Sequence, residues 1–439
     1  MKFGGAGLGD GAAVRRACAI VESRAGAEPI VVVSAHAGVT EELEACARAA
    51  AEGRLLLEPL RLRHKGLLRQ LDLNPELLDK LLAELGHVLY SLSGRRTVEP
   101  EELDFVLSFG ERMSARIVAA CLRSRGCVAT PVDAFDLGLT TDSCHGSARP
   151  LSGVEASLRR SLADIPGVPV VTGFLAKDGS GKLTTLGRNG SDLTAALVAR
   201  AAGAGRLVFW KSVPGIMTAD PQLIPEARVI ETLSLAEARA LAFHGGEILH
   251  PLALEPVQGG DLVVEVRDVR RPDAAGSCLV DRATASGPAA ITGSPLLYGI
   301  EVSHEEGELP GPLFALLHAH RVRPRSLQVL PEGMVVHAPP GTGFELLERE
   351  LGERARRLED CCSVAVVGEV SSADCGELEL LERAGLQPMR AELSAPASCR
   401  LFLLPPGDYV DALRALHRGL LEGAAPRASA ADGQWRARS

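Results

Sequence analysis

The chain has 439 residues, of which 46% are hydrophobic and 23% are charged, and its formal net charge is −9. These values are typical of a soluble globular protein with two or three domains. The negative charge argues against nucleic acid as a partner, because binding to phosphates requires basic patches. No apolar run long enough for a membrane span and no signal peptide are predicted. Ten cysteines without a Cys-x-x-Cys motif favour a reduced, cytoplasmic protein over a disulfide framework or a zinc site.

Predicted strands and helices alternate along the first 285 residues. Strands are predicted at 29–34, 127–132, 168–172 and 206–210, and helices at 11–24, 153–162, 193–202 and 235–243. Residues 41–100 are almost wholly helical in pattern, and a further helix ends near residue 126. This alternation predicts an α/β sandwich on a largely parallel sheet.

The C-terminal part of the chain has a different composition. Arg, Asp, Pro and Gly cluster at Val269–Ser286, which indicates a linker. The following residues have a β-α-β-β-α-β pattern twice over, starting at 296 and at 363, which predicts two ferredoxin-like units. Such units suit a small-molecule sensor or a dimerisation module. The tail at 423–439 is rich in Ala, Arg and Ser and is expected to fray.

The most informative stretch is Thr184–Asp192, which precedes a helix predicted to open at Leu193. Two glycines in this loop let the backbone approach a ligand, and the helix start offers free N–H groups and a positive dipole end. Arg188 and Asp192 bring opposite charges to the loop, which suits the carboxylate and ammonium of an amino acid. An ordinary turn with an N-cap is the alternative interpretation.

Two other segments suit the same chemistry. Lys2, Gly4 and Gly5 begin a Gly-rich loop that could surround a phosphate, with Lys2 as its point charge, although such loops are often only flexible. Glu111, just inside a predicted helix, could bind a substrate ammonium or could simply complement the helix dipole.

The order and spacing of these motifs resemble those of aspartate kinases in the amino-acid kinase superfamily, across nearly the whole chain. The resemblance rests on Lys2-Phe3-Gly4-Gly5, Ser34 to Thr40, Gly110 to Ser114, Thr184 to Asp192, Val213-Pro214-Gly215, Thr218 to Pro221, His250-Pro251 and Ala412 to His417. It implies an amino-acid kinase domain at 1–285 (a three-layer sandwich on a mainly parallel sheet), with a helical insert at 41–100 similar to that of the lysine-sensitive branch. It also implies tandem ACT domains at 286–422 that form a homodimer. Asn189 replaces a usual Gly.

Aspartate kinases transfer the γ-phosphoryl group of MgATP to the β-carboxylate of L-aspartate, mainly by positioning and charge stabilisation. The resemblance assigns catalysis to Lys2, Arg188 and Asp192. It assigns the amino-acid pocket to Thr40, Glu111, Phe174, Arg188, Ser191 and Asp192. Within it, Arg188 would bind a carboxylate, and Glu111 or Asp192 would face the ammonium.

The nucleotide side keeps Gly4 and Gly5 but otherwise departs from the family pattern. Ala6-Gly7 replaces a usual Thr-Ser, Lys211-Ser212 a usual Thr-Asp, Met217 a Tyr, Gln222 an Arg, and Glu247 a Lys. A carboxylate facing a triphosphate would cost about 1 to 4 kcal/mol at roughly 4 Å. Lys211 could offset this by offering its ammonium to the nucleotide or by pairing with Glu247.

Three functions therefore remain open: an aspartate kinase with a remodelled nucleotide pocket, in which Lys211 replaces the missing Lys; a regulatory homologue that only binds aspartate or another amino acid; and an enzyme that uses this pocket with another cosubstrate. In the first ACT unit, Arg325-Ser326-Leu327-Gln328 replaces a usual Thr-Ser-Glu run. Dimerisation is therefore expected more strongly than feedback by lysine.

Overall fold

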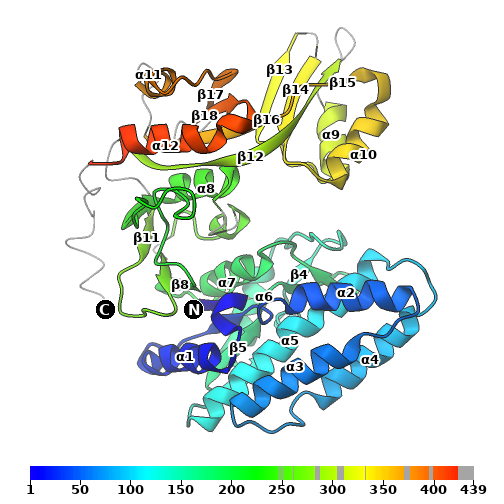
Figure 1. Ribbon diagram of the computed structural model, residues 1–439. Helices are drawn as coiled ribbons and strands as arrows, with labels where there is room; N and C mark the ends of the chain where they lie inside the picture. The colour runs from blue at the N-terminus through cyan, green and yellow to red at the C-terminus, as the bar shows by residue number, and fades with distance from the viewer. Residues whose placement is uncertain are drawn as a thin grey trace. The chain divides into compact units, whose positions relative to one another are not determined.

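The computed structural model describes residues 1–246, 249, 251–260, 262–281, 287–303, 311–331, 333–369, 376–394 and 399–423. It divides into two compact units, each described by itself: Met1–Ile216 with Leu249–Val280, and Met217–Ile248 with Asp281–Ser439. Figure 1 shows the elements of both.

The first unit is built on a mainly parallel sheet. Its strands lie in the order β3 (Ala129–Val132), β5 (Val168–Thr172), β2 (Val31–Val33), β1 (Lys2–Phe3), β8 (Arg206–Lys211), β10 (Val263–Asp268) and β11 (Ser277–Val280). Only the pairing of β10 with β11 is antiparallel among these strands. Runs of Val and Leu form the strands because both faces of the sheet are covered. The carboxyl ends of β1, β2, β5 and β8 thus meet at one edge, where α/β sheets bind ligands.

Helices cover this sheet and extend beyond it. They are α1 (Gly11–Glu22), α2 (Val39–Ala51), α3 (Leu57–Gln70), α4 (Asp79–Leu92), α5 (Pro100–Ser124), α6 (Val154–Ala163) and α7 (Gly190–Ala201). The helix α5 begins with Pro100 and with a capping box between Glu99 and Glu102, which satisfy N–H groups at its start. Buried residues of α1 to α5 form one apolar core with β2 and β5. The helical pattern predicted for 41–100 is confirmed by α2, α3 and α4.

A small second sheet adjoins this core, with the strand order β4 (Thr140–Thr141), β6 (Leu175–Asp178) and β7 (Leu183–Thr185). The hairpin of β6 and β7 leads directly into the loop before α7. It therefore fixes the start of the Thr184–Asp192 stretch.

The second unit contains a seven-stranded sheet in the order β13 (Ser326–Leu330), β14 (Gly333–Ala338), β12 (Gly287–Ser303), β16 (Cys361–Glu369), β18 (Cys399–Leu404) and β17 (Arg390–Ser394), with β15 (Ala355–Arg357) paired to β12. The other elements of this unit are β9 (Thr232–Ser234), α8 (Leu235–His244), α9 (Gly311–Ala319), α10 (Thr342–Leu351), α11 (Gly376–Arg383) and α12 (Tyr409–Leu420).

The long strand β12 joins the two ferredoxin-like halves of this sheet. Its first half pairs with β16 and its second half with β14. The sequence predicts only the second half of β12, from 296, because Gly293, Ser294 and Pro295 are typical turn residues. The expected linker at 269–286 also contains the strand β11. The α/β fold class followed by paired antiparallel units is confirmed.

Residues 217–248 belong to the second unit. Ala219 and Ile224 lie in one apolar cluster with Ile291 and with residues of β16 and α12. Within the same unit, His417 of α12 makes a 3.0 Å hydrogen bond with the Thr218 hydroxyl. The predicted domain boundaries, which placed 217–248 with the N-terminal domain, remain predictions. The expected frayed tail lies outside the described residues except for Gly423.

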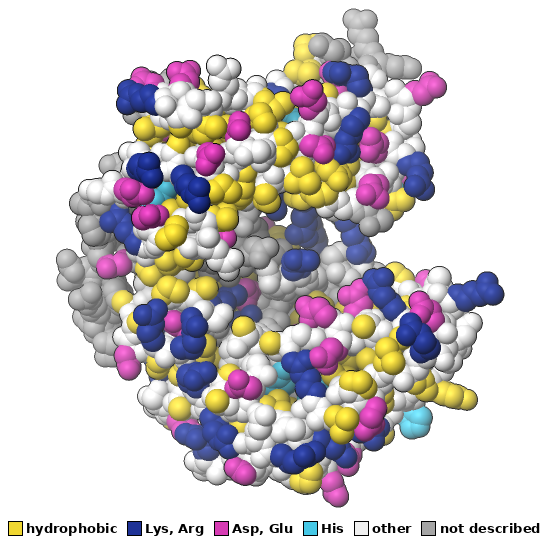
Figure 2. Space-filling model, viewed as in Figure 1, with side chains coloured by type: hydrophobic (Ala, Val, Ile, Leu, Met, Phe, Trp, Pro, Cys, Tyr) yellow, Lys and Arg dark blue, Asp and Glu magenta, His cyan; other side chains and the backbone are white. Residues whose placement is uncertain are grey.

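The described surface has a mixed charge pattern. On the face shown in Figure 2, Lys and Arg side chains alternate with Asp and Glu side chains. None of the described helices is long and apolar enough to cross a membrane.

Candidate functional site

Asp192 is the centre of the candidate site. It lies in the first turn of α7, and its carboxylate is fully buried. Lys2 Nζ lies 2.6 Å from one carboxylate oxygen and Lys211 Nζ lies 2.8 Å from the other. The three side chains form a compact cluster of two cations around one anion.

The sheet brings the two lysines together. Strand β1 pairs in parallel with β8, with Lys2 opposite Phe209 and Phe3 opposite Trp210. Lys211 is the last residue of β8, so its side chain and that of Lys2 reach the same region beside α7. Beneath them the Phe3 and Trp210 rings stack with centroids 6.2 Å apart, and this fixes the two strands.

Each charge of the cluster alters the ionisation of its neighbours. Burial raises the pKa of Asp192, but the Lys2 and Lys211 ammonium groups lower it, and the resulting pKa lies below the usual value. Burial and the nearby Lys2 lower the pKa of Lys211, although Asp192 opposes this shift. An ionised Asp192 is therefore favoured, whereas burial and the Lys2 ammonium disfavour the charged form of Lys211.

Glu111 is a second buried carboxylate in this unit, on α5. One of its oxygens accepts a 3.0 Å hydrogen bond from the Ala35 N–H, just beyond β2. The other oxygen has no hydrogen-bonding partner among the described residues. Burial raises the pKa of Glu111 to about 7, despite opposing contributions from the Ala35 N–H and Lys2. An incoming ammonium group would satisfy the free oxygen and stabilise the ionised form.

The backbone is constrained in the loop before α7 and in the turn between β5 and β6. Phe174 and Asn189 both have positive φ angles, 68° and 58°. Asn tolerates this conformation better than most residues, which explains how it replaces the usual Gly. The Phe174 N–H is fixed by the Thr194 hydroxyl at 3.0 Å. A strained Phe beside the start of a helix is typical of a ligand-binding site.

The remaining predicted pocket residues lie on neighbouring segments. Ser191 is buried in the first turn of α7 and packs closely against the Gly173 backbone. Arg188 is exposed in the loop before α7 and has no partner among the described residues, and Thr40 lies half-buried in the first turn of α2. The structure thus brings Lys2, Asp192 and Lys211 into contact. It shows no contact of Thr40 or Arg188 with them.

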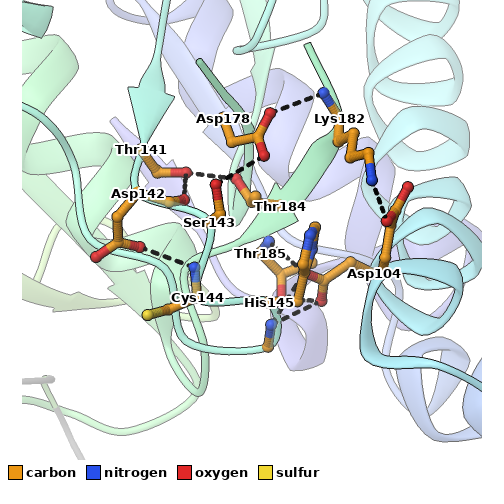
Figure 3. A network of polar contacts seen from close by, with 12 residues as sticks. Asp104, Thr141, Asp142, Ser143, Cys144, His145, Asp178, Lys182, Thr184 and Thr185 are labelled. Atoms are coloured by element: carbon orange, nitrogen blue, oxygen red, sulfur yellow. Dashed lines mark hydrogen bonds and ion pairs between the residues drawn. The ribbon is translucent and has the colours of Figure 1, made fainter. Parts of the chain in front are cut away.

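A polar network around Asp104 joins α5 to β7 and to the segment 145–146 (Figure 3). The buried Asp104 carboxylate accepts hydrogen bonds from the Thr185 hydroxyl and N–H at 2.6 and 3.1 Å, and from the Gly146 N–H at 2.9 Å. His145 Nδ1 lies 3.0 Å from it. A further contact, of 2.6 Å, joins the Thr141 and Thr184 hydroxyls. Burial raises the pKa of Asp104 above its usual value, although the hydrogen bonds with Thr185, Gly146 and His145 oppose this shift.

The residues of this network are not among the site residues predicted from the sequence. Its sequence signal is a lone Asp in the apolar run that precedes Glu111 on α5. Its consequence is that β7, which begins the Thr184–Asp192 stretch, is tied to the same helix that supplies Glu111.

The residues predicted for the nucleotide side belong to both units, and each is described within its own unit. Gly4 lies close to the lysine cluster, since a Cβ atom added to it would be 3.7 Å from Lys2 Nζ, and Gly5 abuts the Ala35 carbonyl. Ser212 is exposed, and its carbonyl accepts a 2.5 Å hydrogen bond from Arg270. Met217 and Gln222 belong to the second unit, and Glu247 lies outside the described residues. The sequence suggested the nucleotide or Glu247 as the partner of Lys211. In the structure its ammonium pairs with Asp192.

A cavity of about 410 Å³ lies elsewhere in the first unit, between α4, α5 and the β6–β7 hairpin. Its charged groups are already paired, Arg112 with Glu84 at 3.2 Å and Lys182 with Glu101 at 2.7 Å. It contains none of the predicted site residues. We therefore place the candidate site at the Asp192 cluster rather than at this cavity.

Comparisons with known proteins show the family to which this chain is similar. The model of the amino acid kinase family matches residues 1–268. Chloroplastic aspartokinase 1 of Arabidopsis thaliana is 31% identical over 291 residues, which cover 64% of this chain and 51% of the relative. The chain spans about half the length of this and two similar Arabidopsis relatives.

A bacterial relative matches over almost its full length. Lysine-sensitive aspartokinase 3 of Escherichia coli (strain K12) is 30% identical over 455 residues, which cover 96% of this chain and 98% of the relative. The crystal structure of E. coli aspartokinase III in complex with aspartate and ADP is similar, with a TM-score of 0.81 and 28% identity, over 95% of this chain and 98% of that one.

Proposed function

This chain belongs to the amino acid kinase family, and from that premise we propose that it is an aspartokinase, which transfers the γ-phosphoryl group of ATP to the β-carboxylate of L-aspartate. The observation that supports this most strongly is the cluster of Lys2, Asp192 and Lys211 at the carboxyl ends of β1 and β8. A transferring phosphoryl group requires concentrated positive charge in a fixed position, and this cluster provides it.

The amino-acid side of the site supports aspartate as the acceptor. The exposed Arg188 guanidinium suits bidentate binding of the substrate α-carboxylate. The free oxygen of Glu111 suits the substrate ammonium. Ser191, Phe174 and Thr40 would complete the pocket. The relative of solved structure was crystallised with aspartate, which supports the same acceptor here.

The phosphate end of a nucleotide fits the first unit. Gly4 leaves open the space beside Lys2 Nζ, and the two ammonium groups together exceed the single negative charge of Asp192. The similar structure contains ADP, which supports a nucleotide as donor. Mg²⁺ is expected to arrive with the phosphates, because it is usually bound by only one or two protein carboxylates. The remodelled nucleotide side, at Ser212, Met217, Gln222 and Glu247, remains a proposal.

The chemistry of the cluster favours catalysis over a purely regulatory role. A regulatory homologue that only binds aspartate would need Arg188 and Glu111, but it would have no need of two lysines on one buried carboxylate. An enzyme that uses a phosphoryl donor other than ATP is also compatible with the cluster. The experiment below distinguishes between the two donors.

The second unit supports association. Its outer strands β13 and β17 expose apolar side chains, with Val329 55% and Leu393 52% exposed. Unpaired strand edges of this kind readily associate. We therefore propose a homodimer formed through this unit.

The test is to incubate the full chain with MgATP and L-aspartate and to trap the acyl phosphate as aspartyl hydroxamate. We expect hydroxamate formation that requires both substrates. Aspartate binding without product from ATP or any other nucleoside triphosphate would instead favour the regulatory homologue. Product formation with another donor only would favour the third alternative.

A further inference from the structure

Lys211 contributes a second ammonium group to a site that already contains Lys2. The side chains of Lys2, Lys211 and Asp192 are 5%, 17% and 0% exposed. Among the described residues, neither ammonium group has another ion-pair partner. By resemblance, a Thr is usual at position 211, so this cation is a feature of this chain.

The charges in the cluster do not balance. Two cations share one carboxylate, and each ammonium has more N–H donors than its single contact with Asp192 uses. A buried cation without a full set of partners is unfavourable, so the cluster is suited to an additional anion. Burial, together with the adjacent Lys2 ammonium, lowers the pKa of Lys211.

The Gly-rich loop places open space beside this charge. The Gly4 N–H donates a 3.5 Å hydrogen bond to the Trp210 carbonyl, immediately before Lys211. Since Gly4 has no side chain, its backbone leaves the volume next to Lys2 Nζ free. The side-chain-free Gly4 backbone thus lies next to the two ammonium groups, and such a backbone can closely approach a phosphate group.

We propose that Lys211 is a catalytic residue: Asp192 holds Lys211 and Lys2 side by side, and both ammonium groups bind the phosphoryl group during its transfer. This inference rests on the proposed aspartokinase function. In the reaction, the bond between the γ-phosphorus and the β,γ-bridging oxygen breaks, and its electron pair stays on the departing ADP. A β-carboxylate oxygen of aspartate forms the new bond to phosphorus, and no proton is transferred. Two cations on the phosphoryl oxygens stabilise the charge that develops on them.

The opposing explanation is that Lys211 only neutralises the buried Asp192. Lys211→Thr and Lys211→Arg separate the two roles, with Lys80→Thr, an exposed lysine on α4, as the matched control. Thermal unfolding and aspartate affinity verify that each variant is folded with an intact acceptor pocket. Lys2 remains to pair with Asp192 in all three variants.

Kinetics form the first arm of the test. We expect Lys211→Thr to lower kcat by about 100-fold or more, the effect of removing one transition-state donor, with aspartate affinity changed by less than about threefold. Lys211→Arg should recover part of kcat. The wild-type rate should also fall at high pH as Lys211 loses its proton, and Lys211→Arg should move this fall to higher pH, because an Arg at this position keeps its charge. An unchanged kcat in folded Lys211→Thr would overturn the proposal.

Binding of inorganic tripolyphosphate, measured by calorimetry, forms the second arm and does not depend on turnover. We expect Lys211→Thr to weaken it about tenfold or more, and Lys80→Thr to leave it unchanged. Equal affinity in wild type and Lys211→Thr would show that Lys211 is not a phosphate ligand. If the wild type made no aspartyl phosphate but bound tripolyphosphate through Lys211, the aspartokinase function would fail while the phosphate site would stand.

Discussion

At the scale of single residues, the ionisation of Glu111 gives the most direct prediction. Burial raises its pKa from 4.5 to about 7, so much of it is protonated in the free protein below neutral pH. A bound ammonium favours the carboxylate and lowers this pKa. Aspartate binding at pH 6 should therefore release a proton, whereas binding at pH 9 should release none from Glu111. Calorimetry in buffers of different ionisation enthalpy measures this release.

Glu111→Gln is the control for that measurement, because it keeps the shape and removes the titration. If proton release persisted in this variant, another group would be its source. The same shift affects stability. A raised folded pKa means that the native state binds more protons than the unfolded state between pH 4.5 and about 7, so the contribution of Glu111 to stability falls as pH rises through this window.

Asp192 should be the most important carboxylate for stability in the cluster. Asp192→Asn leaves two neighbouring buried lysines without their anion, and this should cost about 3 to 5 kcal/mol of unfolding free energy. Asp136→Asn is the matched control, since Asp136 is 61% exposed in its pair with Lys177 and its loss should cost less than about 1 kcal/mol. Urea unfolding measures both. Similar losses in the two variants would mean that the cluster is not a stabilising unit.

At the scale of elements, the Asp104 network should control how firmly β7 positions the loop before α7. Thr185→Val preserves shape but removes the 2.6 Å hydrogen bond to Asp104, and it should lower the unfolding free energy by about 1 to 3 kcal/mol. Aspartate affinity should fall as well, because the loop contains Arg188. Ser91→Ala, which removes an exposed hydrogen bond within α4, should change neither quantity. An unchanged affinity in Thr185→Val would separate this network from the binding loop.

The sequence predicted most of these elements because apolar periodicity determines them. It failed where local and tertiary signals compete. The helix α7 begins at Gly190 rather than at the predicted Leu193. Gly190, Ser191 and Asp192 are typical of a helix N-cap, but the cap in the structure is Asn189, which adopts the left-handed conformation. β12 continues through Gly293 and Pro295 because β16 pairs along it. The pairing of Lys211 with Asp192 depends on the register of β1 and β8, which no local pattern specifies.

At the scale of the whole molecule, the α/β class and the paired antiparallel units were predictable from the alternation of elements. The grouping of residues 217–248 with the C-terminal unit was not, because it depends on long-range packing of Ile224 against Ile291 and α12. A segment that by resemblance contacts the nucleotide is thus part of the same compact unit as the ferredoxin-like sheet.

The proposed dimer gives a prediction at this scale. Val329→Lys places a charge on the exposed edge strand β13 and should convert a dimer into a monomer without unfolding the chain. Sedimentation velocity measures the mass. Leu62→Lys, on the exposed surface of α3, is the control and should leave the dimer intact. A monomeric wild type would remove the proposed association.

In the proposed reaction, a carboxylate oxygen of aspartate attacks the γ-phosphorus of ATP at the Asp192 cluster. Phosphorus NMR of the full chain with MgATP and aspartate labelled with ¹⁸O in its β-carboxylate tests it most directly. We predict an acyl phosphate signal with the isotope shift of a bridging ¹⁸O. Release of ADP and unlabelled inorganic phosphate, with no acyl phosphate formed, would contradict the account.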